Sequence, residues 1–428
     1  MSRMNFVEEL RWRGMIHDMM PGVEEELNKK NRVGYIGFDP TADSLHIGSL
    51  VQIMILVHFQ KAGHKPIALI GGATGMVGDP SGKSNERNLL GKEEIEANIN
   101  GIQKQLEKFL SFDDKENSAE VLNNLSWFES FGFLDFIRDV GKHLSINYMM
   151  AKDSVKSRLE TGMSFTEFSY QLLQGYDFLH LYNKHNCTIQ LGGSDQWGNI
   201  VTGTELIRRK ISGNAFAVTT PLIKKADGTK FGKTEDGNVW LDKKRTSPYK
   251  FYQYWLNASD EDSKNYIKIF TLLDKEEIDA LIASHEEAPH IRILQKKIAE
   301  DITIRVHGQK DFDTAVAASK ILFGKSTTDD LMQLDEDTFL SVFEGVPKYE
   351  MNRSDIESGV GIVDLLGTRS GFLSSNGEAR RDIKGNSISV NKAKINGEII
   401  LDSSSLINNK YILLGKGKKN NYLVIILD

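Results

Sequence analysis

Apolar runs typical of β-strands alternate with helical patterns through the first 225 residues of the chain. RVGYIGFDP (32–40) and KPIALIGG (65–72) have the character of strands, and each is followed by a helical pattern, at 47–63 and 92–110. CTIQLGGSDQWGN (187–199) predicts another strand, which leads into a helix ending near Lys210, and AFAVTTPLI (215–223) predicts one more. This alternation predicts an α/β domain over 1–225, with a doubly wound parallel sheet covered by helices.

The rest of the chain predicts further domains, as expected for 428 residues. A glycine-containing loop at 226–246 is expected to be mobile. Strand signals are absent from 247–324, where apolar residues recur at helical spacing and predict a helical domain. The polar, turn-rich stretch after it favours a linker at 325–358. Residues 359–428 combine the helical pattern SNGEARRDIK with short strand-like pieces such as YILLG, which predicts a small α+β domain.

Charge is unevenly distributed along the chain. Residues 360–428 hold 10 Lys and Arg against 6 Asp and Glu, a net charge of +4, which leaves −10 for the rest of a chain whose total is −6. An acidic body that carries a basic module is typical of proteins that bind a polyanion, although a solvated surface explains such a charge about as often.

Composition also limits where the chain works. No apolar run approaches the roughly 20 residues that cross a bilayer, and the first 20 residues lack the pattern of a secretory signal. Cys187 is the single cysteine, so no intrachain disulfide can form. A cytoplasmic protein without a membrane partner is expected.

Two segments have the composition of anion-binding sites. In GFDPTADSLHIGS (37–49), His46 stands at a predicted helix start, where free N–H groups favour an anion. In ADGTKFGKT (226–234), Lys230 and Lys233 flank a glycine, as a mobile phosphate clamp requires. Alone, each has a plainer interpretation: a capping histidine and two solvated lysines.

Together the two segments resemble the signature motifs of class I aminoacyl-tRNA synthetases, in the same order and with a Rossmann-type sheet between them. Five segments are similar in sequence to tyrosyl-tRNA synthetases of the bacterial type: GFDPTADSLHIG, GGATGMVGDPSGKSNER, FTEFSYQLLQGYDF, GGSDQWGN and KADGTKFGKT. The resemblance is strong over about residues 1–323 and looser beyond. It implies an enzyme that activates L-tyrosine with ATP, releases pyrophosphate and transfers the tyrosyl group to tRNA(Tyr).

The resemblance also implies which residues bind tyrosine. Tyr170, Gln174 and Asp177 are spaced i, i+4, i+7 and share one helical face, which without the motifs would suggest a solvated stripe. The resemblance assigns Tyr170, Gln174 and Asp79 to the substrate ammonium group. It assigns Tyr35 and Asp177 to the phenolic hydroxyl. Phenylalanine would leave that polar pair unsatisfied, and the family needs no editing step, so no editing domain is expected.

The residues implied for ATP form two groups. One group lines the adenylate: Gly37, Asp39, His46, Gly48, Ser49, Gly192, Gly193, Asp195, Gln196 and Lys233. The other gathers around the leaving pyrophosphate and is implied as catalytic: Thr41, His46, Lys83, Arg87, Lys230, Lys233 and Thr234. Catalysis in this scheme is positioning and charge stabilisation, without a protein acid or base. Mg²⁺ is expected to accompany ATP, with no resident cofactor and no metal site made by protein ligands.

Two positions depart from the family pattern. Ser49 replaces the second histidine of the first motif, and Ile36 stands where some relatives carry a polar residue beside the ribose. Both changes predict modestly weaker ATP binding.

SNGEARRDIKGNSISVNKAKI (375–395) resembles a small RNA-binding domain shared by a ribosomal protein and these synthetases. The cations implied to contact tRNA phosphates are Arg380, Arg381, Lys384, Lys392 and Lys394. A solvated helix face is the plainer interpretation.

The family resemblance further implies a homodimer. Two rival interpretations remain open at this point: a tryptophanyl-tRNA synthetase, which Tyr35 and Asp177 disfavour, and an RNA-binding protein that has lost catalysis, which His46, Lys230 and Lys233 disfavour.

Overall fold

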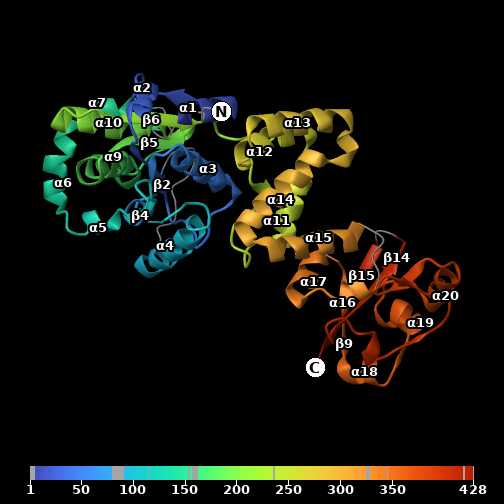
Figure 1. The fold of residues 1–428 in the computed structure, drawn as a ribbon. Coiled ribbons are helices and arrows are strands. Elements are labelled where there is room, and N and C mark those ends of the chain that lie inside the picture. Colours follow the sequence, from blue (N-terminus) through green and yellow to red (C-terminus); the bar gives the residue numbers. More distant parts are fainter. Residues whose placement is uncertain are drawn as a thin grey trace. The chain divides into compact units, whose positions relative to one another are not determined.

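The computed structural model describes residues 5–79, 91–113, 115–152, 155–156, 162–234, 237–323, 328–344, 346–417 and 420–427. The chain forms two compact units (Figure 1). The first unit contains Met1–Thr246 and Ala258–Val306, and the second contains Ser247–Asn257 and His307–Asp428. Each unit is described by itself.

A six-stranded sheet forms the centre of the first unit, in the order β1-β6-β5-β2-β3-β4. All neighbouring strands are parallel except β1, which is antiparallel to β6. The strand order therefore reverses between β2 and β5, where Tyr35 pairs with Gln190 on one side and Ile67 on the other. The strands are β1 (Asp18–Met19), β2 (Val33–Phe38), β3 (Lys65–Ile70), β4 (Glu120–Asn123), β5 (Cys187–Gly193) and β6 (Phe216–Thr220).

Helices cover both faces of this sheet. Helix α3 packs against β2 and β3, whereas α9 and α10 pack on each other and against β5 and β6, on the other side of the strands in Figure 1. The helices around the sheet include α1 (Phe6–Trp12), α2 (Val23–Lys29), α3 (Ile47–Lys61), α4 (Lys92–Leu106), α9 (Phe165–His185) and α10 (Trp197–Ile211). Short helices α5 (Leu125–Phe128), α6 (Phe133–Asp139) and α7 (Ile146–Met150) lie between β4 and α9 in the chain. Helices α12 (Asp260–Phe270), α13 (Lys275–Glu287) and α14 (Ile293–His307) follow the last strand of the sheet.

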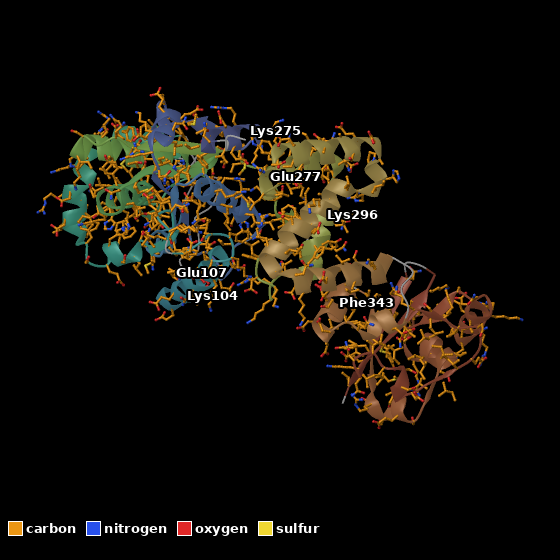
Figure 2. All side chains as sticks on the ribbon, in the orientation of Figure 1. Lys104, Glu107, Lys275, Glu277, Lys296 and Phe343 are labelled. Atoms are coloured by element: carbon orange, nitrogen blue, oxygen red, sulfur yellow. The ribbon has the colours of Figure 1, made fainter. Side chains whose placement is uncertain are left out.

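Burial explains why these segments become strands and amphipathic helices. The last five residues of β3 are buried one after another, as expected for a parallel strand covered on both faces. In α4, Ile95, Ile102 and Leu106 recur at helical spacing and are fully buried, whereas Lys104 and Glu107 point outward (Figure 2). The predicted doubly wound α/β domain is confirmed.

The second unit joins a small helical group to a five-stranded sheet of order β12-β11-β14-β15-β9. The helices are α11 (Pro248–Leu256), α15 (Gln309–Phe323), α16 (Thr328–Met332), α17 (Glu336–Val342), α18 (Arg353–Glu357), α19 (Ile362–Asp364) and α20 (Asn376–Lys384). The sheet contains β9 (Lys348–Asn352), β11 (Ile388–Val390), β12 (Ala393–Lys394), β14 (Tyr411–Lys416) and β15 (Asn420–Leu427), and a separate pair joins β10 (Val360–Gly361) to β13 (Ile400–Leu401). The predicted C-terminal α+β domain is confirmed.

The linker expected at 325–358 is wrong for the residues that the structure describes. Leu331, Phe339 and Phe343 in this stretch have no exposed surface, and β9 pairs in parallel with β15 (Phe343 is labelled in Figure 2). The Phe339 ring contacts that of Tyr411, with centroids 5.1 Å apart. Among the described polar residues of this stretch, Asp335 is the N-cap of α17 and Glu336 and Asp337 lie in its first turn, so this stretch belongs to the second unit.

The helical domain expected at 247–324 is divided. Helices α12, α13 and α14 belong to the first unit, and α11 and α15 to the second. Within the described residues, no helix is long and apolar enough to cross a bilayer.

Candidate active site

A cavity of about 340 Å³ opens where β2 and β5 separate. Its wall includes the carboxyl end of β2 at Gly37 and Phe38, the carboxyl end of β5 at Gly192 and Gly193, and the start of α3 at His46. In open parallel sheets, ligands bind outside the carboxyl ends of the strands at the point where the strand order reverses. The cavity is therefore the candidate active site.

Most of the residues singled out from the sequence line this one cavity. They are Tyr35, Gly37, Asp39, Thr41, His46, Gly48, Ser49, Asp79, Tyr170, Gln174, Asp177, Gly192, Gly193, Asp195 and Gln196. Ile36 lines it too, whereas Lys230 and Lys233 do not. Lys83 and Arg87 lie outside the described residues, and only the backbone of Thr234 is described.

Helix α9 supplies one wall of the cavity. It begins at the N-cap Ser164, whose hydroxyl accepts a hydrogen bond from the Glu167 N–H. Tyr170, Gln174 and Asp177 all reach the cavity from this helix, as their spacing predicted.

Asp177 is a buried carboxyl group without a cationic hydrogen-bond partner among the described residues. Only 2% of its surface is exposed, and its oxygens accept hydrogen bonds from Asn124 Nδ2 at 3.0 Å and from Trp127 Nε1 at 2.9 Å. Burial raises the pKa of Asp177 to about 8, although the two hydrogen bonds oppose the shift. The carboxyl therefore holds a proton near neutral pH unless a ligand stabilises its charge.

Tyr35 reaches the same end of the cavity from β2. Its side chain is 1% exposed, and its hydroxyl has no hydrogen-bond partner among the described residues. Burial and the nearby Asp177 raise the pKa of Tyr35 well above its ordinary value. An unpaired buried hydroxyl beside a buried carboxyl is a complementary site for one more hydroxyl group.

The next part of the cavity is rich in hydrogen-bond acceptors. Tyr170 Oη donates to Asp39 Oδ2 at 2.9 Å, and Gln196 Nε2 donates to Asp79 Oδ2 at 2.7 Å. The side-chain carbonyl of Gln174 is buried without a hydrogen-bond partner among the described residues. Two carboxylates and a free amide oxygen suit a small cation such as an ammonium group.

Glycines keep the opposite part of the cavity open. A Cβ atom on Gly192 would lie 2.9 Å from Ile200 Cδ1, and one on Gly193 would lie 2.5 Å from Asp195 Oδ1. A Cβ on Gly37 would meet nothing within 4 Å. A ligand can therefore approach the backbone of both strands closely.

His46 is the N-cap of α3, as expected. Its Nδ1 accepts the Gly48 N–H at 3.0 Å, which in the neutral ring leaves the proton on Nε2. Trp240 pairs with His46 by an antiparallel bridge and contacts its ring edge-on, with centroids 6.0 Å apart.

The loop with Lys230 and Lys233 lies against the start of α3. Gly232 has φ +84°, and a Cβ on it would lie 3.3 Å from the Gly48 nitrogen, so both backbone conformation and space require glycine. Val239 N–H donates to the Gly232 carbonyl at 3.1 Å and Ile47 N–H to the Val239 carbonyl at 2.9 Å. Residues Lys233–Thr234 (β7) pair with Gly237–Asn238 (β8), and both lysine side chains are exposed.

Several residues of the site were missed in the sequence. Asn124 and Trp127 hold Asp177, and Thr74, Gln190 and Trp240 line the cavity. Asn124 follows β4 directly, so a polar residue at the carboxyl end of a parallel strand was a usable signal, but β4 itself was not predicted. Within the described residues, no group of three or more His, Cys, Asp or Glu side chains could hold a metal ion.

Comparison with known proteins identifies the family. Residues 27–324 match the family described as tRNA synthetases class I (W and Y), and residues 338–424 match the tyrosine–tRNA ligase SYY-like C-terminal domain. The chain is 60% identical to a tyrosine–tRNA ligase of Flavobacterium johnsoniae over 99% of its own length and 100% of that protein. The chain belongs to the tyrosine–tRNA ligase family. A tyrosine–tRNA ligase of Cytophaga hutchinsonii is 61% identical to it over 98% of the chain and 99% of that protein.

A solved structure supports the fold of this tyrosine–tRNA ligase family member. A C-terminally truncated mitochondrial tyrosyl-tRNA synthetase of Aspergillus nidulans superposes with a TM-score of 0.68 and 30% identity, covering 75% of this chain and 95% of that one. The family, fold class and type of enzyme predicted from the sequence are confirmed. The tryptophanyl and non-catalytic alternatives are set aside by the full-length match.

The raised pKa of Asp177 predicts a pH-dependent contribution to stability. The unfolded chain releases this proton near pH 4, whereas the folded chain keeps it to about pH 8. The stability that the folded chain gains from protonated Asp177 is therefore fully present below pH 4. It is lost as pH rises toward 8, by at most about 1.4 kcal/mol per pH unit.

We expect the free energy of unfolding of the wild type, relative to Asp177→Asn, to fall from pH 4 to pH 8. Urea unfolding of both proteins across this range measures the difference. Glu25→Gln, at an exposed carboxyl of α2, is the matched control. A pH-independent difference between the wild type and Asp177→Asn would contradict the assignment.

Proposed function

We propose that the chain carries out its family's reaction in the cavity between β2 and β5. The carboxylate of L-tyrosine attacks the α-phosphorus of ATP, which forms tyrosyl-adenylate and releases pyrophosphate. The tyrosyl group then passes to the 3′ end of tRNA(Tyr), and AMP leaves. The observation that carries this proposal is the Tyr35 hydroxyl, which has no hydrogen-bond partner in the described part of the chain and lies beside the buried Asp177 carboxyl, in a cavity whose other part is lined by glycines.

Tyr35 and Asp177 select the phenol in this proposal. The substrate hydroxyl makes the hydrogen bond that Tyr35 lacks and shares a proton with Asp177, whose position is fixed by Asn124 and Trp127. Phenylalanine has the same ring but leaves the Tyr35 hydroxyl unsatisfied and gives Asp177 no partner beyond Asn124 and Trp127, and an unsatisfied buried neutral group costs about 1–3 kcal/mol.

Tyr170, Gln174 and Asp79 bind the substrate ammonium. Their acceptor-rich arrangement supports this role, and Asp39, which accepts from Tyr170, adds a second carboxylate nearby. Burial raises the pKa of Asp195, to which the neighbouring Asp79 contributes. An ammonium group would offset the repulsion between these carboxylates.

The nucleotide occupies the glycine-lined part of the cavity, as its magnesium complex. Gly37, Gly192 and Gly193 leave room beside the backbone, and Asp195, Gln196, Gly48 and Ser49 complete the adenylate site. The negative charge that grows on pyrophosphate is stabilised by Thr41 after β2, by His46 at the N-cap of α3, and by Lys230, Lys233 and Thr234 of the adjacent loop. Lys83 and Arg87 are assigned to the same group from the motif alone.

The second unit binds tRNA in this proposal. Arg380, Arg381 and Lys384 are exposed on α20, and Lys394 is exposed on β12. Asn391 and Lys392 have φ 48° and 70°, so Lys392 is part of the two-residue hairpin turn rather than beyond it. Arg380 pairs with Glu398 at 3.0 Å, which makes Arg381 and Lys384 the stronger candidates for phosphate contact.

A homodimer is supported by several large apolar side chains that are exposed on the first unit. Phe133, Leu134, Ile146 and Phe165 lie on α6, α7 and the start of α9, and Leu134 exposes 78% of its surface. Exposed aromatic and aliphatic groups in this number are typical of protein interfaces. We assign the second copy of the chain as the partner, and the reducing cytoplasm as the compartment, since the single cysteine is free and buried.

Lys230→Ala and Lys233→Ala should each slow adenylate formation about a hundredfold, the scale for losing one group that stabilises transition-state charge. Tyrosine affinity should stay unchanged, because neither lysine lines the tyrosine end of the cavity. Pre-steady-state activation and equilibrium tyrosine binding measure the two effects. Lys224→Ala, an exposed lysine of the same segment, is the control, and a loss of tyrosine affinity at normal rate would contradict the proposal.

Arg381→Glu combined with Lys384→Glu should weaken tRNA binding and leave tyrosine-dependent ATP–pyrophosphate exchange intact. The slope of log affinity against log salt should become shallower by about one for each phosphate that the variant no longer neutralises. Lys348→Glu is the control, because it makes the same charge change as either substitution alone. Lys348 lies on β9, and β9 and β12 form the two opposite edges of the five-stranded sheet. An equal loss of affinity per charge in this control would show that overall charge, rather than α20, governs binding.

A further inference from the structure

Helix α12 holds the loop that carries Lys230 and Lys233. Phe231, between the lysines, stacks on Phe270 with centroids 5.3 Å apart and contacts the Tyr266 ring edge-on at 5.2 Å. Phe270 and Tyr266 are almost fully buried. At the other end of the helix, Asp262 accepts the Ala226 N–H at 2.8 Å. The position of the loop therefore depends on where α12 lies.

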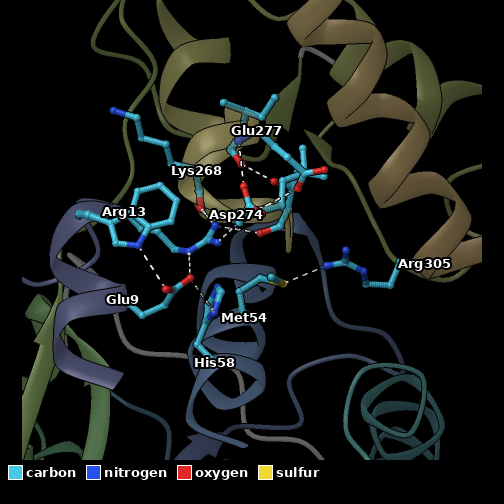
Figure 3. A network of polar contacts seen from close by, with 12 residues as sticks. Glu9, Arg13, Met54, His58, Lys268, Asp274, Glu277 and Arg305 are labelled. Atoms are coloured by element: carbon cyan, nitrogen blue, oxygen red, sulfur yellow. Dashed lines mark hydrogen bonds and ion pairs between the residues drawn. The ribbon is translucent and has the colours of Figure 1, made fainter. Parts of the chain in front are cut away.

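Arg13, just after α1, binds the carboxyl end of α12 (Figure 3). Its Nη1 donates to the carbonyls of Lys268 at 2.5 Å and Thr271 at 3.0 Å, and its Nη2 donates to the Leu273 carbonyl at 2.6 Å. These groups belong to the last turn of a helix and the residues after it, where carbonyls lack helical partners and a cation is favoured. One guanidinium thus fixes three carbonyls at the end of α12.

The guanidinium is itself held firmly. The Arg13 side chain is 1% exposed, and its Nε donates to Glu9 Oε1 at 2.7 Å. Burial lowers the pKa of Arg13 from its very high ordinary value, and the ion pair with Glu9 opposes that shift. Arg305 of α14 adds a hydrogen bond to the Phe270 carbonyl at 3.4 Å, and it also contacts Met54 of α3 and pairs with Asp301 at 2.6 Å.

Helix α1 is attached in turn to the last turn of α3, the helix whose N-cap is His46. The rings of Phe6 and Phe59 meet edge-on with centroids 5.0 Å apart, and Phe6 and Leu10 are fully buried. In Figure 3, Glu9 and Arg13 approach the end of α12 beside His58 and Met54 of α3. A continuous set of packed contacts therefore joins the last turn of α3, at Phe59, to the lysine loop through α1, Arg13 and α12.

We infer that Arg13 is a positioning residue for the activation step. By fixing the carboxyl end of α12, it sets where the loop with Lys230 and Lys233 lies relative to the N-terminus of α3. The inference rests on the proposed role of the two lysines. Arg13 itself does not line the cavity.

The inference predicts a slower reaction with unchanged tyrosine binding. Arg13→Gln should lower the rate of adenylate formation about tenfold, within the range measured for coupling through packed contacts. The tyrosine dissociation constant should stay within about twofold, since Tyr35 and Asp177 lie on β2 and α9. Arg13→Lys keeps a cation that can reach part of the carbonyl set and should recover part of the rate.

Two control variants separate positioning from general stability. Arg11→Gln removes an exposed arginine of α1 that pairs with Glu24, and should have the wild-type rate. Phe6→Leu weakens the packing of the same helix without touching the carbonyls of α12, and supplies a variant of reduced stability. At matched fractions folded, Arg13→Gln should be slower than Phe6→Leu.

Because Phe231 and Arg13 act through the same helix, Phe231→Leu and Arg13→Gln should slow the reaction less together than the product of their single effects.

Lys233→Ala, measured alongside, distinguishes the two ways of failing. A normal rate in Lys233→Ala would overturn the proposed role of the loop. A slow Lys233→Ala together with a wild-type rate in Arg13→Gln would overturn the inference alone, as would effects of Arg13→Gln and Phe231→Leu that multiply independently. If Arg13→Gln does not fold, the same comparison is made with Arg13→Lys and Phe231→Leu, singly and combined. A wild-type rate in Arg13→Lys, with a combined variant no slower than Phe231→Leu alone, overturns the inference.

Discussion

The separation of β2 from β5 at the reversal of strand order is the constraint on which the active site depends. The two strands pair side by side through Tyr35 and Gln190, but α3 leaves β2 on one face and α10 leaves β5 on the other. Backbone groups at both carboxyl ends are consequently free to meet a ligand. Gly37, Gly192 and Gly193 line the cavity between the two strands and leave room beside the backbone, and the N-terminus of α3 borders the same cavity.

The end of the cavity that we propose for the substrate phenol shows how specificity can be built at the expense of stability. A carboxyl group at Asp177 and a hydroxyl group at Tyr35 are both buried, and their hydrogen-bonding capacity is only partly used. An apolar pair would pack at lower free-energy cost but would accept phenylalanine as readily as tyrosine. Asn124 and Trp127 orient Asp177 without pairing it with a cation, which agrees with the phenol that we propose as its partner.

The fold was predictable where burial imposes a simple pattern. Strand β3 and helix α4 follow their expected segments closely, because a doubly covered strand and an amphipathic helix each have a clear periodicity. The stretch containing Leu331 and Phe339 was misjudged, since its short helices have polar caps and bury few residues each. Their packing partners, such as Tyr411, come from distant parts of the sequence.

The site was predictable where a motif fixes the residue and unpredictable where only a contact does. His46 and Gly232 belong to motifs whose backbone geometry the structure shows directly. Asn124, Trp127 and Arg13 act through hydrogen bonds to residues at least 50 positions away, and no local pattern marks them. Side chains that orient other side chains need the folded chain to be recognised.

The amino-acid selectivity of activation tests the central claim most directly. ATP–pyrophosphate exchange is measured with tyrosine and with phenylalanine, for the wild type and for Asp177→Ala, and kcat/KM is compared. The buried polar pair predicts strong preference for tyrosine in the wild type and a collapse of that preference in the variant. Undiminished selectivity in Asp177→Ala, or exchange that phenylalanine supports as well as tyrosine in the wild type, would contradict the account.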